Sequence, residues 1–260
     1  MNKLLFFLIS FFPFFCLQAQ EKIRLEITED IALTFVKIPA GKIVIGADST
    51  MAFFQKDELP AFQAIFTDDF YIGQTEVTQE LWEHVMAYNP SVFKDAKRPV
   101  EMVSWNDCQA FIEKLNSTWQ GKGEFKMPTE AQWEYAAKLG EPEFRDEQGK
   151  IINRELFKYA WYNSRSEGKS HPVATKKADK LGLYDMQGNM WEWVLDWKGA
   201  YTSATKTNPT GPNTGTHKVY RGGSWFNEPE ALRSENRNAH PPDEVFTNAG
   251  LRLIYVLENR

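Results

Sequence analysis

The stretch GLYDMQGNMWEW, residues 182–193, decides how this chain folds. Gly188 and Asn189 indicate a tight turn, because both residue types adopt the backbone conformations that turns need. Asp185 and Glu192 stand on either side of that turn. Two carboxylates and the turn carbonyls can converge on one hard cation, which prefers oxygen ligands. Alternatively, Asp185 caps the turn and Glu192 pairs with an arginine, and the residues alone favour this second interpretation.

Helical patterns lie upstream of this stretch. We expect helices over 78–88, from Ser104 onward and over 128–140. Thr78 is the N-cap expected for the first, and the pairs Ser104/Asp107 and Thr129/Gln132 have the spacing of capping boxes in the other two. The second helix carries one apolar stripe of Trp105, Cys108, Phe111, Ile112 and Leu115.

Strand patterns are shorter. Two strands are predicted within 31–46 around a Pro-Ala-Gly turn, and further strands over 70–78 and 251–257, whereas 53–68 is expected to be a surface loop. Between 141 and 249 there are many turns and few long apolar runs. Such a segment is compact only if its backbone groups are paired irregularly or tied by a metal. No linker divides the chain, so we expect one domain over 20–260.

The first 19 residues are predicted to be a signal peptide. Lys3 precedes an apolar stretch from Leu4 to Leu17, and Ala19 marks a small-residue cleavage site. The protein is therefore expected to be exported to the periplasm, the cell surface or the medium. A lipid anchor on Cys16 and an uncleaved N-terminal anchor are the weaker alternatives.

Charge and cysteine content exclude several classes. The formal net charge is −5, which disfavours nucleic-acid binding because phosphate contacts need a basic face. After cleavage Cys108 is the only thiol, so no intramolecular disulfide can form. Cys108 is expected to be a buried small hydrophobe. The nine tryptophans predict an aromatic core.

Several segments together resemble the formylglycine-generating enzyme, or sulfatase-modifying factor, family. They are TEVT (75–78), PVEMVSWNDCQAF (99–111), MPTEAQWEYAA (127–137), HPVATKKADKLGLYDMQGNMWEW (171–193), RGGSW (221–225) and AGLR (249–252). The resemblance spans nearly the whole chain after residue 19. It implies an α+β fold with little regular secondary structure, distantly similar to C-type lectins, with a shallow cleft on one face.

The resemblance also implies a departure from the family's chemistry. Family enzymes use two cysteines after the GGS segment to bind copper(I) and oxidise a sulfatase cysteine to formylglycine. Here Asn227 and Leu232 stand at those positions. Copper(I) prefers thiolate ligands, so copper is not expected and no residue is assigned a catalytic role.

The resemblance further implies a structural calcium ion and a ligand cleft. The calcium ligands would be the side chains of Asp185 and Glu192 and the carbonyls of Gly188 and Met190. The cleft residues would be Trp191, Arg221, Ser224, Asn227 and Arg237.

The leading hypothesis is a non-catalytic binding or scaffold module for an unidentified envelope protein, extracellular protein or glycan. The alternatives are a formylglycine-generating oxidase with a rearranged site, or another enzyme that uses the same cleft. The four histidines have no metal-binding spacing. A Ser224–His240–Asp243 triad lacks the nucleophile elbow of hydrolases.

Overall fold

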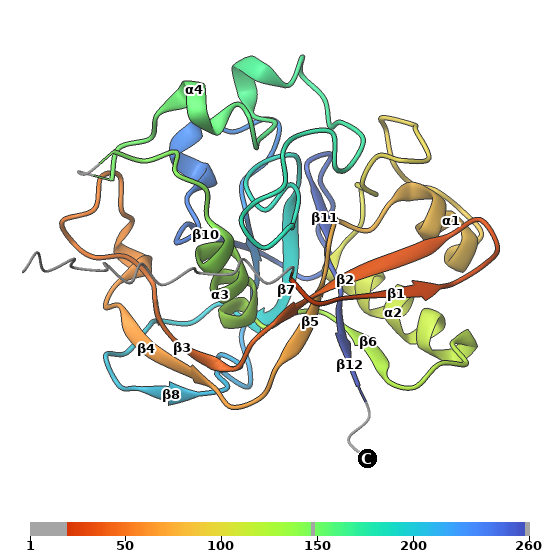
Figure 1. Cartoon of the computed structure of the whole chain (residues 1–260), viewed down its shortest axis with the longest axis horizontal. Coiled ribbons are helices and arrows are strands. Elements are labelled where there is room, and N and C mark those ends of the chain that lie inside the picture. Colours follow the sequence, from red (N-terminus) through yellow and green to blue (C-terminus); the bar gives the residue numbers. More distant parts are fainter. Residues whose placement is uncertain (1–19, 147–148, 258–260) are drawn as a thin grey trace, which may run out of the picture.

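The computed structural model describes residues 20–146 and 149–257, and the predicted signal peptide lies outside them. Three sheets make up the strands of the described chain (Figure 1). The five-stranded sheet has the order β1 (Lys22–Glu26), β2 (Ala32–Ile38), β5 (Phe70–Gly73), β12 (Ile254–Val256) and β6 (Glu124–Lys126). The four-stranded sheet has the order β10 (Arg237–His240), β9 (Lys218–Arg221), β7 (Trp191–Trp197) and β11 (Ala249–Leu251). The three-stranded sheet consists of β3 (Gly41–Ile45), β4 (Phe62–Phe66) and β8 (Lys206–Thr207).

The expected helices are present. They are α1 (Gln79–Met86), α2 (Trp105–Thr118) and α3 (Glu130–Gly140), and a short α4 (Asn153–Leu156) follows. Both predicted capping boxes form, at Ser104 and at Thr129, whereas Thr78 stands at the N-cap of α1 without a side-chain hydrogen bond. The α+β class is confirmed. No helix among residues 20–146 and 149–257 is long and apolar enough to span a membrane.

Two large apolar clusters fill most of the interior of the described chain, beside a smaller one that contains Leu232. The first joins α1 and α2 to the five-stranded sheet and contains the predicted stripe of α2, with Cys108 completely buried. The second surrounds α3, which packs against β3, β7 and β9 and lies near the centre of the molecule (Figure 1). Helix α3 therefore links the three-stranded sheet to the four-stranded one.

Three predictions about strands were wrong in detail. The strand predicted over 70–78 is shorter, because β5 ends at Gly73. The predicted loop over 53–68 contains β4, which pairs with β3; its alternation of Phe62, Ala64 and Phe66 is flanked by charged residues that hid it. The predicted strand over 251–257 is two strands in different sheets, because β11 ends at Leu251 and β12 begins at Ile254. The chain changes sheet at Arg252, whose side chain is fully buried.

Arg252 joins four separate parts of the fold. Its Nε donates to Glu192 Oε2 at 2.9 Å and its Nη2 to Glu192 Oε1 at 2.7 Å. The same guanidinium donates to the carbonyls of Gly73 and Tyr184, at 2.9 and 2.8 Å. It therefore ties β7, the end of β5 and the 182–189 turn to the junction between β11 and β12.

Replacing Arg252 tests this link. We expect Arg252→Met to lower the free energy of unfolding by about 3–5 kcal/mol, because Glu192 would stay buried without its cation. Urea unfolding followed by tryptophan fluorescence measures the change. The matched control is Arg24→Met, which breaks the exposed Arg24–Glu26 pair and should cost at most about 1 kcal/mol. Equal effects of the two variants would refute a central role for Arg252.

Candidate functional site

The turn at residues 185–192 is buried and unusual in its backbone. Asp185 and Asn189 both have φ of 58°, and Gly188 has φ of 87°. A side chain at Gly188 would meet the Trp161 carbonyl at 2.3 Å, so only glycine fits there. The Asp185 carboxylate accepts from the Ala174 N–H at 2.9 Å through one oxygen. Its other oxygen, Oδ1, is buried without a hydrogen-bond partner.

Glu192 makes the arginine contact that the residues alone favoured. Besides Arg252, it accepts from the indole N–H of Trp133 at 2.6 Å. A third carboxylate, Glu76, accepts from the Asn189 side chain and the Met190 N–H, at 2.9 and 3.1 Å. Glu192 thus binds the Arg252 guanidinium directly, and the buried Glu76 and Asp185 act on it electrostatically.

Electrostatics at this cluster favour an added positive charge. Burial, together with the negative charges of Asp185 and Glu192, raises the pKa of Glu76 well above its usual range. Burial also raises the pKa of Asp185 to about 6. No group of three or more His, Cys, Asp or Glu side chains among the described residues has the arrangement of a metal site. The unpartnered Oδ1 of Asp185 is the observation that fits a cation, whereas Glu192 is already engaged.

The five residues predicted to form a cleft do not all face one surface. Trp191 is buried with its ring edge-on to Tyr220, 4.8 Å between centroids. Ser224 Oγ donates to Asn227 Oδ1 at 2.7 Å and is itself buried. Leu232 is completely buried in a small apolar cluster with Phe144, Leu156, Ala160 and Tyr162.

The two predicted arginines share a buried carboxylate. Arg237 binds Glu130 through two parallel contacts of 2.7 Å each, and Arg221 Nε lies 3.2 Å from Glu130 Oε1. Arg221 also pairs with Glu134. Although burial acts in the opposite direction, Arg237 and Arg221 hold the pKa of Glu130 below its usual value.

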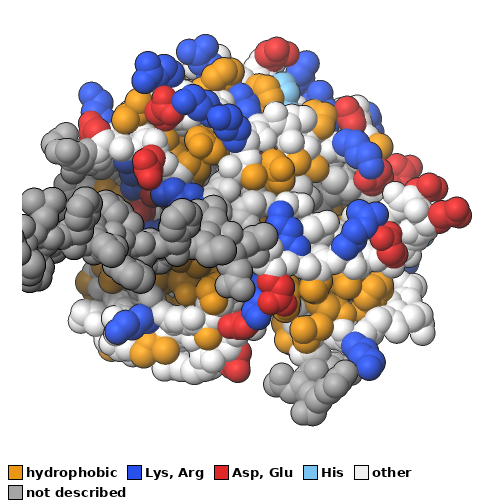
Figure 2. Space-filling model, in the orientation of Figure 1, with side chains coloured by type: hydrophobic (Ala, Val, Ile, Leu, Met, Phe, Trp, Pro, Cys, Tyr) orange, Lys and Arg blue, Asp and Glu red, His pale blue; other side chains and the backbone are white. Residues whose placement is uncertain are grey.

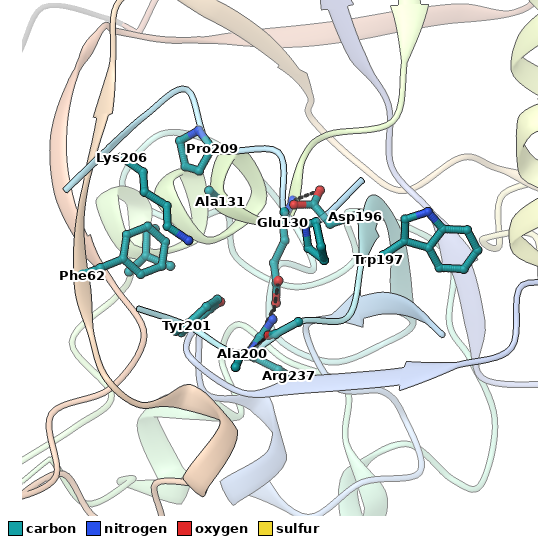
Figure 3. Close-up of a pocket in the computed structure, with 14 residues that line it drawn as sticks. Phe62, Glu130, Ala131, Asp196, Trp197, Ala200, Tyr201, Lys206, Pro209 and Arg237 are labelled. Atoms are coloured by element: carbon teal, nitrogen blue, oxygen red, sulfur yellow. Dashed lines mark hydrogen bonds and ion pairs between the residues drawn. The ribbon is translucent and has the colours of Figure 1, made fainter. Parts of the chain in front are cut away.

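Arg237 also lines a pocket of about 270 Å³ between α3 and the segment 199–212, which follows β7 and contains β8 (Figure 3). The other four predicted cleft residues do not line it. Its walls are mainly apolar and aromatic, with four charged side chains among them. The lining residues are Ile45, Phe62, Glu130, Ala131, Asp196, Trp197, Gly199, Ala200, Tyr201, Lys206, Pro209, Gly211, Pro212 and Arg237.

The aromatic and charged groups of the pocket are held in place by one another. The Arg237 guanidinium lies 3.8 Å from the centre of the Tyr201 ring, and Phe62 meets that ring edge-on at 5.0 Å. Asp196 is 4% exposed and accepts from the Glu130 N–H at 2.8 Å, at the start of α3. Burial and the neighbouring Glu130 charge raise the pKa of Asp196 to about 7.

Sequence reasoning missed Glu76, Glu130, Asp196, Tyr201 and Arg252 as site residues. Glu76, Glu130 and Arg252 stand in the segments TEVT, MPTEAQWEYAA and AGLR, but nothing in one sequence pairs a given arginine with a given carboxylate. The Ser224–His240–Asp243 triad is not assembled in the described chain, because Ser224 contacts Asn227 and His240 contacts Glu244. Cys108 is buried, as expected, and burial raises its pKa well above the usual value.

Known proteins resemble this chain in sequence. Residues 26–257 match the model of the sulfatase-modifying factor enzyme 1-like domain. The chaperone protein LppX of Paenibacillus barcinonensis is 27% identical over 232 residues, which cover 72% of this chain and 80% of LppX. The formylglycine-generating enzyme of Mus musculus is 32% identical over 185 residues, 66% of this chain. The match spans about half of that enzyme's length, 48%.

Solved structures resemble it as well. Treponema denticola variable protein 1 superposes with a TM-score of 0.79 and 29% identity, covering 90% of this chain and 98% of that one. PvdO from Pseudomonas aeruginosa superposes with a TM-score of 0.74 and 24% identity, again over 90% and 98%. The expected α+β fold is therefore confirmed.

The burial of Asp196 makes stability depend on pH. Because its pKa is about 7 in the folded protein and near 4 in an unfolded chain, the folded state binds the extra proton between these values. The contribution of Asp196 to the free energy of unfolding is fully present below pH 4 and is lost as the pH rises from 4 through 7. Asp196→Asn lacks this titration. Its free energy of unfolding should therefore rise relative to that of wild type by roughly 1.4 kcal/mol per pH unit between pH 5 and 6.5.

Urea unfolding at four pH values measures this difference. The control is Asp30→Asn, which removes an exposed carboxylate in the turn between β1 and β2 and should leave the wild-type profile unchanged. Parallel profiles for wild type and Asp196→Asn would show that Asp196 is ionised normally.

Proposed function

This chain belongs to the sulfatase-modifying factor family over residues 26–257, and we propose that within this family it is a non-catalytic binding or scaffold module. Its ligand site is the pocket between α3 and the segment 199–212. The supporting observation is the state of the two positions where the family's cysteines are expected. Leu232 is completely buried among apolar side chains, and Asn227 is bonded to Ser224.

Thiol chemistry at Cys108, the cysteine of the described residues, is not part of this proposal. Cys108 is completely buried in α2, and a thiol with a raised pKa is a poor nucleophile and a poor metal ligand. Export is part of the proposal, and it rests on the predicted signal peptide. The envelope partner is unidentified.

The alternative is an enzyme that uses the same pocket. One observation favours it: Asp196 has a pKa of about 7 in an apolar pocket, and such groups serve as general acids or bases at neutral pH. The binding role is preferred because the other charged groups of the pocket wall are engaged: Glu130 and Arg237 bind each other, and Lys206 lies over the Phe62 ring.

The binding role predicts that the protein binds its partner only when the pocket is open. Ala200 is exposed and lines the pocket, whereas Ala204 is exposed in the same loop and does not. We expect wild type and Ala204→Trp, immobilised, to retain the same partner from envelope fractions. Ala200→Trp should lose most of it, because the indole blocks the mouth. Quantitative mass spectrometry of the retained proteins measures this.

Two outcomes would contradict the proposal. Equal retention by Ala200→Trp would exclude the pocket as the ligand site. Conversion of a sulfatase-motif cysteine peptide to an aldehyde by the wild-type protein, with copper(I) and oxygen, would exclude a non-catalytic role. A cysteine-bearing member of the family is the positive control.

We also propose a structural calcium ion at the 185–192 turn. Asp185, with its unpartnered oxygen, would hold it with the Gly188 and Met190 carbonyls, and Glu192 would join them through an oxygen that it shares with Arg252. The ion would supply positive charge that three buried carboxylates lack with Arg252 alone. No step of binding elsewhere depends on it.

Calcium should then raise the melting temperature. A ligand that binds only the folded state, at about 100 times its dissociation constant, adds roughly 2.7 kcal/mol, which is about 5 °C or more for a domain of this size. Asp185→Asn should remove the response and Asp30→Asn should keep it. Glu192 variants are uninformative, because they also break the Arg252 pair. A wild-type melt that is the same in chelator and in millimolar calcium would refute the site.

A further inference from the structure

Asp196 is a pocket carboxylate without a cation of its own. It is 4% exposed, and one oxygen accepts from the Glu130 N–H. The other, Oδ1, lies beside Gly211 in the pocket wall, where a β-carbon at Gly211 would approach it to 2.8 Å. No ion pair to Asp196 is present among the described residues, and an uncompensated buried carboxylate is costly.

Arg237, which lines the pocket, and the nearby Lys198, which does not, are committed to other groups. Arg237 places both of its forked contacts on Glu130. Lys198 donates to Asp57 at 2.6 Å. Neither is free to neutralise Asp196.

The other two nearby lysines are also held away. Lys218 Nζ donates to the Leu195 carbonyl at 2.8 Å and sits 3.9 Å from the ring centres of both Trp105 and Trp197. Lys206 Nζ lies 4.9 Å from the centre of the Phe62 ring. Figure 3 shows Lys206 and Phe62 on one side of the pocket and Asp196 on the other, with Glu130 between them.

The rest of the wall suits an aliphatic chain. Tyr201, Pro209, Pro212 and Ala131 line the approach to Asp196. A volume of about 270 Å³ accommodates one side chain rather than a drug-sized ligand. The aromatic faces are already covered by Arg237 and Lys206, so flat stacking of a ligand ring has less support than an extended stem.

We propose that this pocket binds an alkylammonium group on an apolar stem, the chemistry of a lysine side chain, with the ammonium on Asp196 and the stem against Tyr201 and the prolines. The inference rests on the proposed function only in taking this pocket as the ligand site. It adds the class of ligand: a primary amine, either free or on a partner polypeptide.

Ligand binding should depend on pH. The groups that act on Asp196 are Glu130 on α3, Lys218 on β9 and Arg237 on β10. The pKa of Asp196 is about 7 in the free protein, and the cation binds only the ionised form. The apparent affinity should therefore be about tenfold weaker at pH 6 than at pH 8, because it scales with the ionised fraction.

The test is an NMR titration of the mature protein with Nα-acetyl-lysine methylamide, following the tryptophan indole signals. Nα-acetyl-norleucine methylamide has the same stem without the charge, and n-butylammonium is the free-amine arm. We expect the lysine probe to bind at least about tenfold more tightly than the norleucine probe, as for a hydrogen bond between charged groups. Comparable binding of n-butylammonium would identify a free amine as sufficient, and much weaker binding would identify a polypeptide lysine.

Two variants keep the test decisive. Asp196→Asn should abolish the preference for lysine, and Asp30→Asn should keep it. Gly211→Ala retains the Asp196 charge but places a methyl group against Oδ1, so it should also weaken the lysine probe several-fold. Equal binding of lysine and norleucine probes, or a lysine preference that survives in Asp196→Asn, would overturn the proposal. Partner capture that fails in Ala200→Trp would stand independently of this result.

Discussion

The contact between Arg252 and Glu192 is the constraint on which the rest of this structure depends. The guanidinium stands where the chain passes from the four-stranded sheet to the five-stranded one, and it also holds the carbonyls of Gly73 and Tyr184. Cys108 is unpaired, so no disulfide closes the long irregular segments. Their ordering is opposed by roughly 1–2 kcal/mol of backbone entropy per residue. Buried arginine–carboxylate pairs act instead, and Arg233 with Glu58 forms another of them.

The same kind of contact shapes the pocket. Glu130 begins α3 and binds Arg237 of β10 and Arg221 of β9, so one carboxylate fixes the helix against the sheet. Arg237 then supports the Tyr201 ring. Asp196 caps the first N–H of α3, and no ion pair to its carboxylate is present among residues 20–146 and 149–257. The neighbouring cations Arg237, Lys198 and Lys218 bind other groups, which is why we propose a positively charged ligand for Asp196. Basic and acidic side chains are interspersed on the face shown in Figure 2.

Local patterns in the sequence were sufficient to predict the longer helices, but they did not predict which residues meet in the site. The capping pairs at Ser104 and Thr129 and the stripe on α2 involve residues three or four apart, so one sequence contains all the information they need. Glu192 and Arg252 are 60 residues apart, and Arg237 and Glu130 are 107 apart; no periodicity connects them. The sequence therefore offered an arginine partner for Glu192 without naming it. The cleft prediction named Arg237, which lines the pocket, together with Trp191 and Ser224, which are buried elsewhere.

A double-mutant cycle on Arg252 and Glu192 tests the central claim most directly. The free energies of unfolding of wild type, Arg252→Met, Glu192→Gln and the double variant are measured in urea under one set of conditions. If the two side chains act as one buried unit, the double variant is no less stable than the worse single variant, and the coupling energy is about 2–3 kcal/mol. Additive losses, with a coupling energy below about 0.5 kcal/mol, would contradict a central role for this pair. Other contacts would then stabilise the loop-rich segment 141–249.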